Sequence, residues 1–258
     1  MTISGLRRFD RLAVVVHPDA DRMGRAAAEE AAAALRAGIA ERGRARAIFA
    51  AANSQLPLFA ALRELTDLDW SRIEAFHMDE YLGLDGAHPA SFRSFLERHL
   101  VSPLGIGTFH RIDGTPGAAE ATARDYAARL GAAPIDLCCM GIGENGHLAF
   151  NDPPVADFRD PLSLKVVPLD PASRRQQVGE GHFADLDAVP THALTLTIPV
   201  LLSARRVVVV VPDARKADAV AAALLGSIAP ACPASVLRTI DHATLHLDPA
   251  AAGQLPPP

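Results

Sequence analysis

One loop of the sequence combines an amide, an imidazole and a carboxylate. Segment 140–153, MGIGENGHLAFNDP, carries Asn145, His147 and Asp152 among glycines and prolines. A histidine can change its charge near neutral pH, and a neighbouring polar group can fix the orientation of its ring. We therefore expect an acid–base site in this loop. Gly143 is expected to contact the ligand, because a residue without a Cβ lets the backbone approach it closely.

Three other interpretations of this loop have to be weighed. GIGENG at 141–146 matches the GxGxxG pattern of dinucleotide sites, but NDPP at 151–154 follows it in place of a long helix. A metal site would need grouped ligands, and the sequence has no HExxH motif and no paired-cysteine spacing. His147 could also simply complete the hydrogen bonding of a turn. We expect neither a metal nor another cofactor.

The position of the loop in the chain supports a ligand site. It follows IDLCC at 135–139, an apolar run typical of a buried strand, and ligand sites of open α/β sheets collect where strands end. The same pattern predicts further strands at 12–16, 45–50, 73–77, 206–211 and 243–247, with helices at 21–41, 56–65 and 118–130 and after 212. The fold class is therefore α/β: a Rossmann-like, open, mostly parallel sheet with helices on both faces. We expect a single domain over residues 1–258, with flexible tails at 1–10 and 253–258.

An acidic pair follows the predicted strand at 73–77. Asp79 and Glu80 are flanked by apolar residues, which favours a cleft over a solvated turn. Neighbouring side chains at the end of a strand point to different sides, so only one of the two is expected to enter the cleft. Burial and the second charge would raise the pKa of that carboxyl group, as a general base near neutral pH requires.

Three further segments could bind an anion. Asn53 and Ser54 precede the predicted helix at 56–65, and Lys216 lies near the start of the helix after 206–211. Free amides at a helix start attract anions, although Asn and Ser are also common as plain caps. Arg174 and Arg175 lie in the glycine-rich polar segment 173–183, which we interpret as a flexible cover, or alternatively as a solvated arginine pair.

Composition limits the possible partners. The chain has 258 residues, a mass of 27.2 kDa and 49% hydrophobic residues, enough for one substantial core. A net charge of −5 provides no basic field, so we expect neither nucleic acid nor a membrane as partner. Three cysteines suit a reducing compartment, and we find no apolar signal segment or membrane-spanning run. We expect a cytoplasmic protein.

Four segments together resemble the glucosamine-6-phosphate deaminase (isomerase) family. They are FHMDEYLG at 76–83, GIGENGHLAFNDP at 141–153, VPTHALT at 189–195 and DARKA at 213–217. The related 6-phosphogluconolactonases share the fold and a GxGxxGH loop, but their loop continues differently. The resemblance covers most of the chain and favours the deaminase branch.

The resemblance implies roles for the acid–base residues. Asp79 would move a proton between the amine-bearing carbon and its neighbour, and His147 would open the sugar ring. Asn145 and Asp152 occupy the positions of two acids that flank this histidine in the family. Asp152 is one methylene shorter than the usual glutamate, so either the loop moves inward or a water bridges the gap.

The resemblance also implies how the substrate is held. Lys216 and Arg175, with Arg174 as the alternative, would bind the phosphate beside Asn53 and Ser54. Glu80 and Gly143 are further expected substrate contacts. Family members have glycine where this chain has Ala51 and Ala52. The expected substrate is an amino-sugar phosphate, and homo-oligomers are possible. A 6-phosphogluconolactonase-type hydrolase and a non-catalytic sugar-phosphate sensor remain open alternatives.

Overall fold

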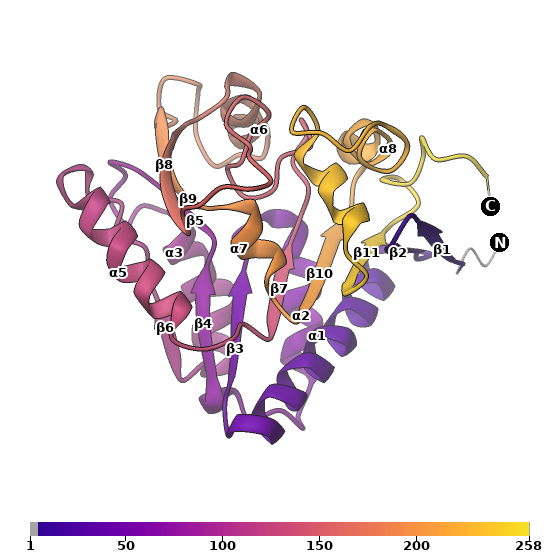
Figure 1. Ribbon diagram of the computed structural model, residues 1–258, viewed down its shortest axis with the longest axis horizontal. Coiled ribbons are helices and arrows are strands. Elements are labelled where there is room, and N and C mark those ends of the chain that lie inside the picture. The colour runs from indigo at the N-terminus through magenta and orange to yellow at the C-terminus, as the bar shows by residue number, and fades with distance from the viewer. Residues whose placement is uncertain (1–4, 258) are drawn as a thin grey trace.

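An eight-stranded sheet forms the centre of the protein (Figure 1). The computed structural model describes residues 5–257. All neighbouring strands of this sheet are parallel except β1 and β2. In spatial order the strands are β1 (Leu6–Phe9), β2 (Leu12–Val16), β11 (Ala243–Leu247), β10 (Arg206–Val211), β7 (Leu137–Met140), β3 (Ala45–Phe49), β4 (Ile73–His77) and β6 (Thr108–His110).

Helices cover both faces of this sheet, as the alternation of strands and helices predicts (Figure 1). One face packs against α1 (Ala20–Arg42), α2 (Leu56–Glu64) and α3 (Phe92–Leu96). The other packs against α5 (Ala119–Gly131), α7 (Ile198–Leu202) and α8 (Ala217–Leu225). The short turns are η1 (Asn53–Gln55), η2 (Trp70–Arg72), η3 (Glu97–Val101), α4 (Ser102–Leu104), η4 (Pro116–Ala118), η5 (Ala214–Lys216) and η6 (Pro233–Thr239).

The valine run of β10 shows why the sheet is buried on both sides. Val207 and Val209 contribute to the core on the α5 side, whereas Val208 and Val210 contribute to the core on the α1 side. Successive side chains of a strand point to opposite faces, so a continuous apolar run is what a doubly covered parallel strand requires. The open, mostly parallel sheet with helices on both faces is confirmed.

A second sheet of three antiparallel strands lies beside the large one. It consists of β5 (Asp79–Tyr81), β9 (His192–Leu196) and β8 (Leu164–Pro168), in that order. Only Met78 separates the end of β4 from the start of β5, so the chain passes directly from one sheet to the other at this residue. A three-residue strand carries too little pattern to be recognised in the sequence.

One prediction about a flexible segment differs from the structure. Residues Leu6–Phe9 form β1 and pair with β2, so the predicted tail over 1–10 is wrong for this part; residues 1–4 lie outside the described residues. At the other end of the chain, the Pro256 carbonyl accepts a hydrogen bond from the Arg7 guanidinium at 2.8 Å.

The predicted cover at 173–183 begins within a regular helix. This helix, α6 (Pro171–Gly179), starts at Asp170, whose side chain accepts a hydrogen bond from the Ala172 amide at 2.7 Å. Aspartate before the first turn and proline at its first position favour helix initiation. None of the helices in residues 5–257 has the length and apolar character needed to cross a membrane.

Candidate active site

A cavity lies beyond the carboxyl ends of β3, β7 and β10, which are adjacent in the large sheet. The loop after each of these strands contributes to its wall, β5 contributes one side, and α6 closes another. Its lining residues are Ala50, Ala51, Ala52, Ser54, Met78, Asp79, Phe92, Gly141, Ile142, Gly143, His147, Ala149, Phe150, Gln176, Gln177, Glu180 and Lys216. The site therefore occupies the position where open α/β sheets bind their ligands.

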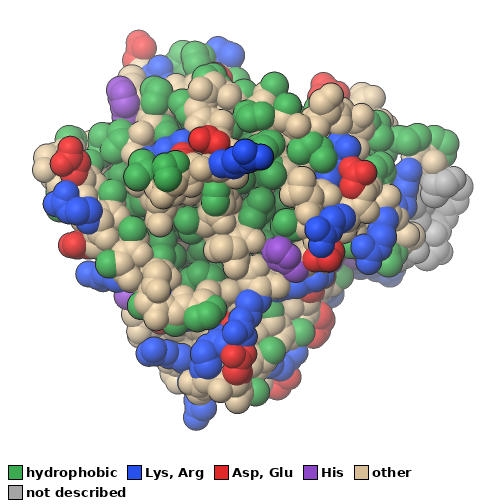
Figure 2. Space-filling model, viewed as in Figure 1, with side chains coloured by type: hydrophobic (Ala, Val, Ile, Leu, Met, Phe, Trp, Pro, Cys, Tyr) green, Lys and Arg blue, Asp and Glu red, His purple; other side chains and the backbone are tan. Residues whose placement is uncertain are grey.

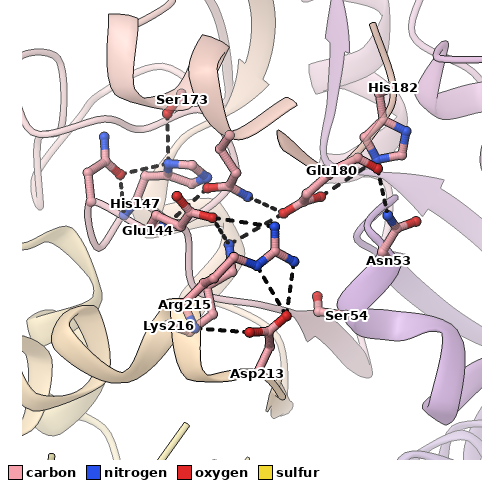
Figure 3. Close-up of polar contacts among 12 residues, drawn as sticks. Asn53, Ser54, Glu144, His147, Ser173, Glu180, His182, Asp213, Arg215 and Lys216 are labelled. Atoms are coloured by element: carbon pink, nitrogen blue, oxygen red, sulfur yellow. Dashed lines mark hydrogen bonds and ion pairs between the residues drawn. The ribbon is translucent and has the colours of Figure 1, made fainter. Parts of the chain in front are cut away.

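The imidazole of His147 is held by three oxygen atoms around Nδ1. They belong to Asn145 Oδ1 at 2.8 Å, Ser173 Oγ at 2.9 Å and Asp152 Oδ1 at 3.0 Å. Figure 3 shows His147 and Ser173 pointing toward each other. Because these neighbours act best as acceptors, we assign the proton of the neutral ring to Nδ1, which leaves Nε2 available for a ligand.

Asp152 supports this histidine from a fully buried position. Its Oδ1 accepts hydrogen bonds from Asn145 Nδ2 at 2.9 Å and from the Ser173 hydroxyl. Burial acts to raise the pKa of Asp152, but the hydrogen bonds and charge of its neighbours, above all His147, outweigh burial and lower it. The carboxylate contacts the ring directly, so the shorter side chain needs no bridging water.

Ser173 is a part of this arrangement that the sequence analysis missed. It is buried on the first turn of α6, and its hydroxyl group forms hydrogen bonds with both His147 and Asp152. The available signal was the Asp170-Pro171 helix start, which would have shown which residues of the segment face the loop.

Gly143 has no space for a side chain. A Cβ at this position would lie 2.2 Å from Cε1 of His147, far inside van der Waals contact. The Gly143 amide also donates to the His147 carbonyl at 3.0 Å. The glycine therefore lets the imidazole lie against the loop backbone, in addition to lining the cavity.

Asp79 lines the same cavity as His147 and belongs to β5. Its backbone pairs with Thr195 of β9, which fixes its position in the small sheet. Burial, and then the charge of Glu80, raise the pKa of Asp79 well above its usual range. A carboxyl group of this kind is suited to exchange protons with a carbon acid near neutral pH.

Glu80, a predicted substrate contact, points away from the cavity. Its Oε1 accepts hydrogen bonds from the amides of Tyr81 at 3.0 Å and Phe92 at 3.1 Å. Its Oε2 accepts from Ser91 Oγ at 2.8 Å and the Arg93 amide at 3.0 Å. Glu80 therefore satisfies the free amides at the start of α3 and is not among the residues that line the cavity.

Two of the predicted anion ligands line the cavity. Ser54 lies in η1 after β3, and Lys216 lies at the end of η5 after β10. Asn53 is exposed and donates from Nδ2 to the Glu180 carbonyl at 3.4 Å instead of facing the cavity. Ala51 and Ala52 form part of the wall, and neither has a positive φ, so glycine is not needed there.

The predicted phosphate arginines lie elsewhere. Arg175 is exposed on α6, and Arg174 donates to the carbonyls of Leu186 at 2.5 Å and Val189 at 2.9 Å. The next two residues of the same helix, Gln176 and Gln177, line the cavity in their place. α6 therefore presents amides, not guanidinium groups, to the ligand.

Glu180, at the end of α6, is a further cavity residue that the sequence analysis missed. Its Oε1 lies 3.5 Å from Lys216 Nζ and accepts a hydrogen bond from Gln176 Nε2 at 2.8 Å (Figure 3). Its Oε2 lies 3.6 Å from His182 Nε2. Burial acts to raise the pKa of Glu180, but His182, Lys216 and Gln176 outweigh it and lower the pKa to about 2.

The described part of the chain contains no group of three or more His, Cys, Asp or Glu side chains arranged to hold a metal ion. The side chains that line the cavity include the imidazole of His147, the carboxyl groups of Asp79 and Glu180, the ammonium group of Lys216 and the amides of Gln176 and Gln177.

Comparison with known proteins identifies the family. A family model described as glucosamine-6-phosphate isomerases/6-phosphogluconolactonase matches residues 18–246. The chain belongs to this family. It is 35% identical over 250 residues to a glucosamine-6-phosphate deaminase of Streptomyces avermitilis, covering 94% of this chain and 92% of that protein. A glucosamine-6-phosphate deaminase of Bacillus cereus is 33% identical over 199 residues, or 77% of this chain and 74% of that one.

Solved structures of the family have the same fold. A monomeric glucosamine-6-phosphate deaminase superposes with a TM-score of 0.84 at 26% identity, covering 93% of this chain and 99% of that chain. A 6-phosphogluconolactonase from Shewanella baltica gives a TM-score of 0.74 at 19% identity, over 95% of this chain and 100% of that chain. The family resemblance inferred from the four segments is confirmed, and family members of both kinds are enzymes.

Proposed function

We propose that this protein converts glucosamine 6-phosphate and water to fructose 6-phosphate and ammonia. The observation that carries the proposal is that Asp79 and a braced His147 line one cavity that also contains Lys216. The sequence similarity to glucosamine-6-phosphate deaminases supports the substrate class. The free cysteines Cys138, Cys139 and Cys232 suit a reducing cytoplasm.

His147 would act first, on the closed sugar ring. Nε2 takes the proton of the anomeric hydroxyl, and the imidazolium that forms returns a proton to the ring oxygen as the ring opens. Asp152 is ionised beside Nδ1 and stabilises this transient positive charge, while Asn145 and Ser173 keep the ring orientation. The product of this step is the open-chain amino aldose.

Asp79 would then carry the isomerisation. The carboxylate removes the proton from the amine-bearing carbon and returns it to the neighbouring carbonyl carbon, while one amine proton passes to the carbonyl oxygen, which gives a ketose imine with a hydroxyl group on the former carbonyl carbon. Water adds to the imine carbon, and ammonia leaves. Because burial and Glu80 raise the pKa of Asp79, the conjugate acid persists long enough to return the proton. Activity should rise with pH as Asp79 ionises.

The phosphate would be held by Lys216 and the amides and hydroxyl near Ser54. Cationic and anionic side chains are interspersed over the face of the molecule seen in Figure 2, so no large field of one sign draws an anion to it. The attraction must come from within the cavity, where Ser54 lies in η1 before α2 and Lys216 lies at the end of η5 before α8.

A turnover screen tests the proposal. Glucosamine, galactosamine and N-acetylhexosamine 6-phosphates and 6-phosphogluconolactone are each supplied in deuterated water. Ammonia, ketose, lactone hydrolysis and deuterium at the carbon next to the carbonyl are measured. We expect ammonia, ketose and deuterium incorporation from glucosamine 6-phosphate. Hydrolysis of 6-phosphogluconolactone without deuterium exchange would favour the lactonase alternative instead, and binding without any turnover would indicate a sensor.

A further inference from the structure

The anion end of the cavity already contains a carboxylate. Glu180 Oε1 lies 3.5 Å from the Lys216 ammonium and 2.8 Å from the Gln176 amide nitrogen (Figure 3). Only 7% of the Glu180 side chain and 6% of the Lys216 side chain are exposed, so water screens this pair poorly. The geometry is that of an anion bound to the one ammonium group the cavity offers.

Glu180 is fixed in this position by its backbone as well as by its side chain. Its amide donates to the Gln176 carbonyl at 2.8 Å at the end of α6. Its carbonyl accepts from Asn53 Nδ2 at 3.4 Å, which ties the end of α6 to the loop after β3. The end of α6 and the loop after β3 therefore both position the Glu180 carboxylate beside Lys216.

Among the described residues that line the cavity, no second cationic side chain is available to pair with Glu180 while Lys216 binds phosphate. Lys216 is the only lysine or arginine among the residues lining the cavity in the described part of the chain. The pKa of Glu180 is lowered to about 2, so its carboxylate is ionised at neutral pH. Protonation of Glu180 therefore does not release Lys216 from this ion pair. An incoming phosphate would meet a like charge within hydrogen-bond reach of its own ligand.

We propose that Glu180 competes with the substrate's phosphate for Lys216, so that this carboxylate sets the affinity and the selectivity of the site for phosphorylated sugars. The inference rests on the proposed function in assigning Lys216 to the phosphate. When phosphate binds, Glu180 turns away from Lys216, and His182, 3.6 Å from its other oxygen, remains as its partner. The same competition keeps Lys216 paired when the cavity holds no anion.

Calorimetric titration with inorganic phosphate measures this competition directly. Glu180→Gln keeps the size of the side chain and an oxygen for Gln176 but removes the charge. We expect its dissociation constant for phosphate to fall by about tenfold or more relative to wild type. Glu180→Asp, which keeps the charge, should remain close to wild type. Phosphate binding by Glu180→Gln that is no tighter than wild type overturns the proposal.

Glu144 provides a matched control. Its Oε1 also lies near Lys216 Nζ, at 3.9 Å, but 34% of its side chain is exposed. Glu144→Gln should change phosphate affinity by less than about threefold, because solvent screens this charge. A gain in Glu144→Gln as large as that in Glu180→Gln would show a general charge effect and overturn the specific role.

Two further measurements separate this inference from folding defects and from the proposed function. Glu180→Ala is expected to show the same gain, so it carries the test if Glu180→Gln does not fold by circular dichroism. Unphosphorylated glucosamine should bind the wild type and Glu180→Gln equally. If the wild type releases no ammonia but Glu180→Gln binds phosphate more tightly, the proposed function fails and the competition stands. If the wild type releases ammonia but Glu180→Gln does not bind phosphate more tightly, the competition is excluded and the proposed function stands.

Discussion

Adjacent carboxyl groups at positions 79 and 80 lie in opposite surroundings because side chains alternate across β5. Asp79 faces the cavity, whereas Glu80 faces the amides of α3. Asp79 therefore faces the cavity with a pKa raised by burial and by the charge of Glu80, whereas Glu80 accepts hydrogen bonds that hold the start of α3. Substitutions that preserve shape and remove charge should separate these two functions.

Asp79→Asn is expected to lower turnover by roughly 10²- to 10⁴-fold, the usual contribution of a general base, while phosphate binding persists. The same change should stabilise the protein. Because the folded-state pKa of Asp79 is raised, wild type loses stability as pH rises above its unfolded-state value, and asparagine does not ionise. Thermal unfolding at pH 7 should give the variant the higher Tm, with the difference shrinking toward pH 4. A variant that retains both turnover and deuterium exchange would exclude Asp79 as the base.

Gly143→Ala tests the position of the imidazole. The new Cβ would overlap the His147 ring, so the ring must leave its contacts with Asn145 and Asp152. We expect kcat to fall by about 10²-fold or more. Affinity for inorganic phosphate should change little, because its proposed ligand is Lys216 and not the ring. Gly179→Ala is a control, because a Cβ there meets no atom within 4 Å. Equal losses in the two variants would contradict this role of Gly143.

At this scale the sequence identified residue types better than side-chain directions. Asp79, His147, Ser54 and Lys216 follow ends of strands, and the structure brings all four to one cavity. Arg175 could not be placed, because the direction of a side chain on a helix turns by about 100° with each residue and the start of α6 was not recognised. The same uncertainty concealed Ser173, Gln176 and Glu180.

At the scale of elements, the site depends on short segments that link longer ones. The predicted strands at 73–77, 206–211 and 243–247 have the bounds observed for β4, β10 and β11. The valine run of β10 is a continuous apolar segment, and such segments are typical of buried strands. β5, β6 and β1 have three or four residues each, and their pairing partners, not their own sequence, make them strands. The two-sheet arrangement was therefore not predictable from local pattern.

Glu80→Gln should weaken the start of α3. The amide nitrogen of glutamine cannot accept from Ser91 Oγ and the Arg93 amide, so one buried and one partly buried donor lose their acceptor. We expect the free energy of unfolding to fall by about 1 to 3 kcal/mol in urea titrations, with turnover of the folded enzyme within about twofold of wild type. Glu120→Gln on the exposed side of α5 should change stability by less than about 0.5 kcal/mol. A strong loss of turnover in folded Glu80→Gln would place Glu80 in the reaction after all.

At the scale of the whole molecule, a buried histidine pair at the carboxyl ends of β2 and β11 joins the large sheet to α1. His17 Nε2 lies 3.0 Å from His246 Nδ1, and His246 Nε2 lies 3.2 Å from Glu30 of α1. Burial, followed by the charge of His246, lowers the pKa of His17 to about 4, against the smaller opposing effect of Asp19. A neutral His17 is thus part of the folded state.

Acidification should therefore destabilise the protein through His17. The unfolded chain binds a proton at His17 near pH 6.5, whereas the folded protein resists protonation until about pH 4. Stability from this residue is fully present above pH 6.5 and is lost as pH falls toward 4. Unfolding free energies at pH 7 and pH 5 should differ less for His17→Gln than for wild type. Identical pH dependence in the two proteins would show that His17 titrates normally when folded.

Under the proposed function, the two sheets would divide the reaction between them. The loop that holds His147 and the segment that holds Lys216 follow strands of the large sheet, whereas Asp79 belongs to the small one. Hydrogen bonds from the Phe150 amide to Thr195 Oγ1 at 3.1 Å and from Asn151 Nδ2 to the Leu196 carbonyl at 2.8 Å join them. The large sheet would thus carry sugar-phosphate binding and ring opening, and the small sheet would carry proton transfer between the two carbons. Substitutions in the small sheet could therefore remove the carbon base and leave the phosphate site intact. This gives a physical route from one scaffold to reactions that need no proton transfer between carbons.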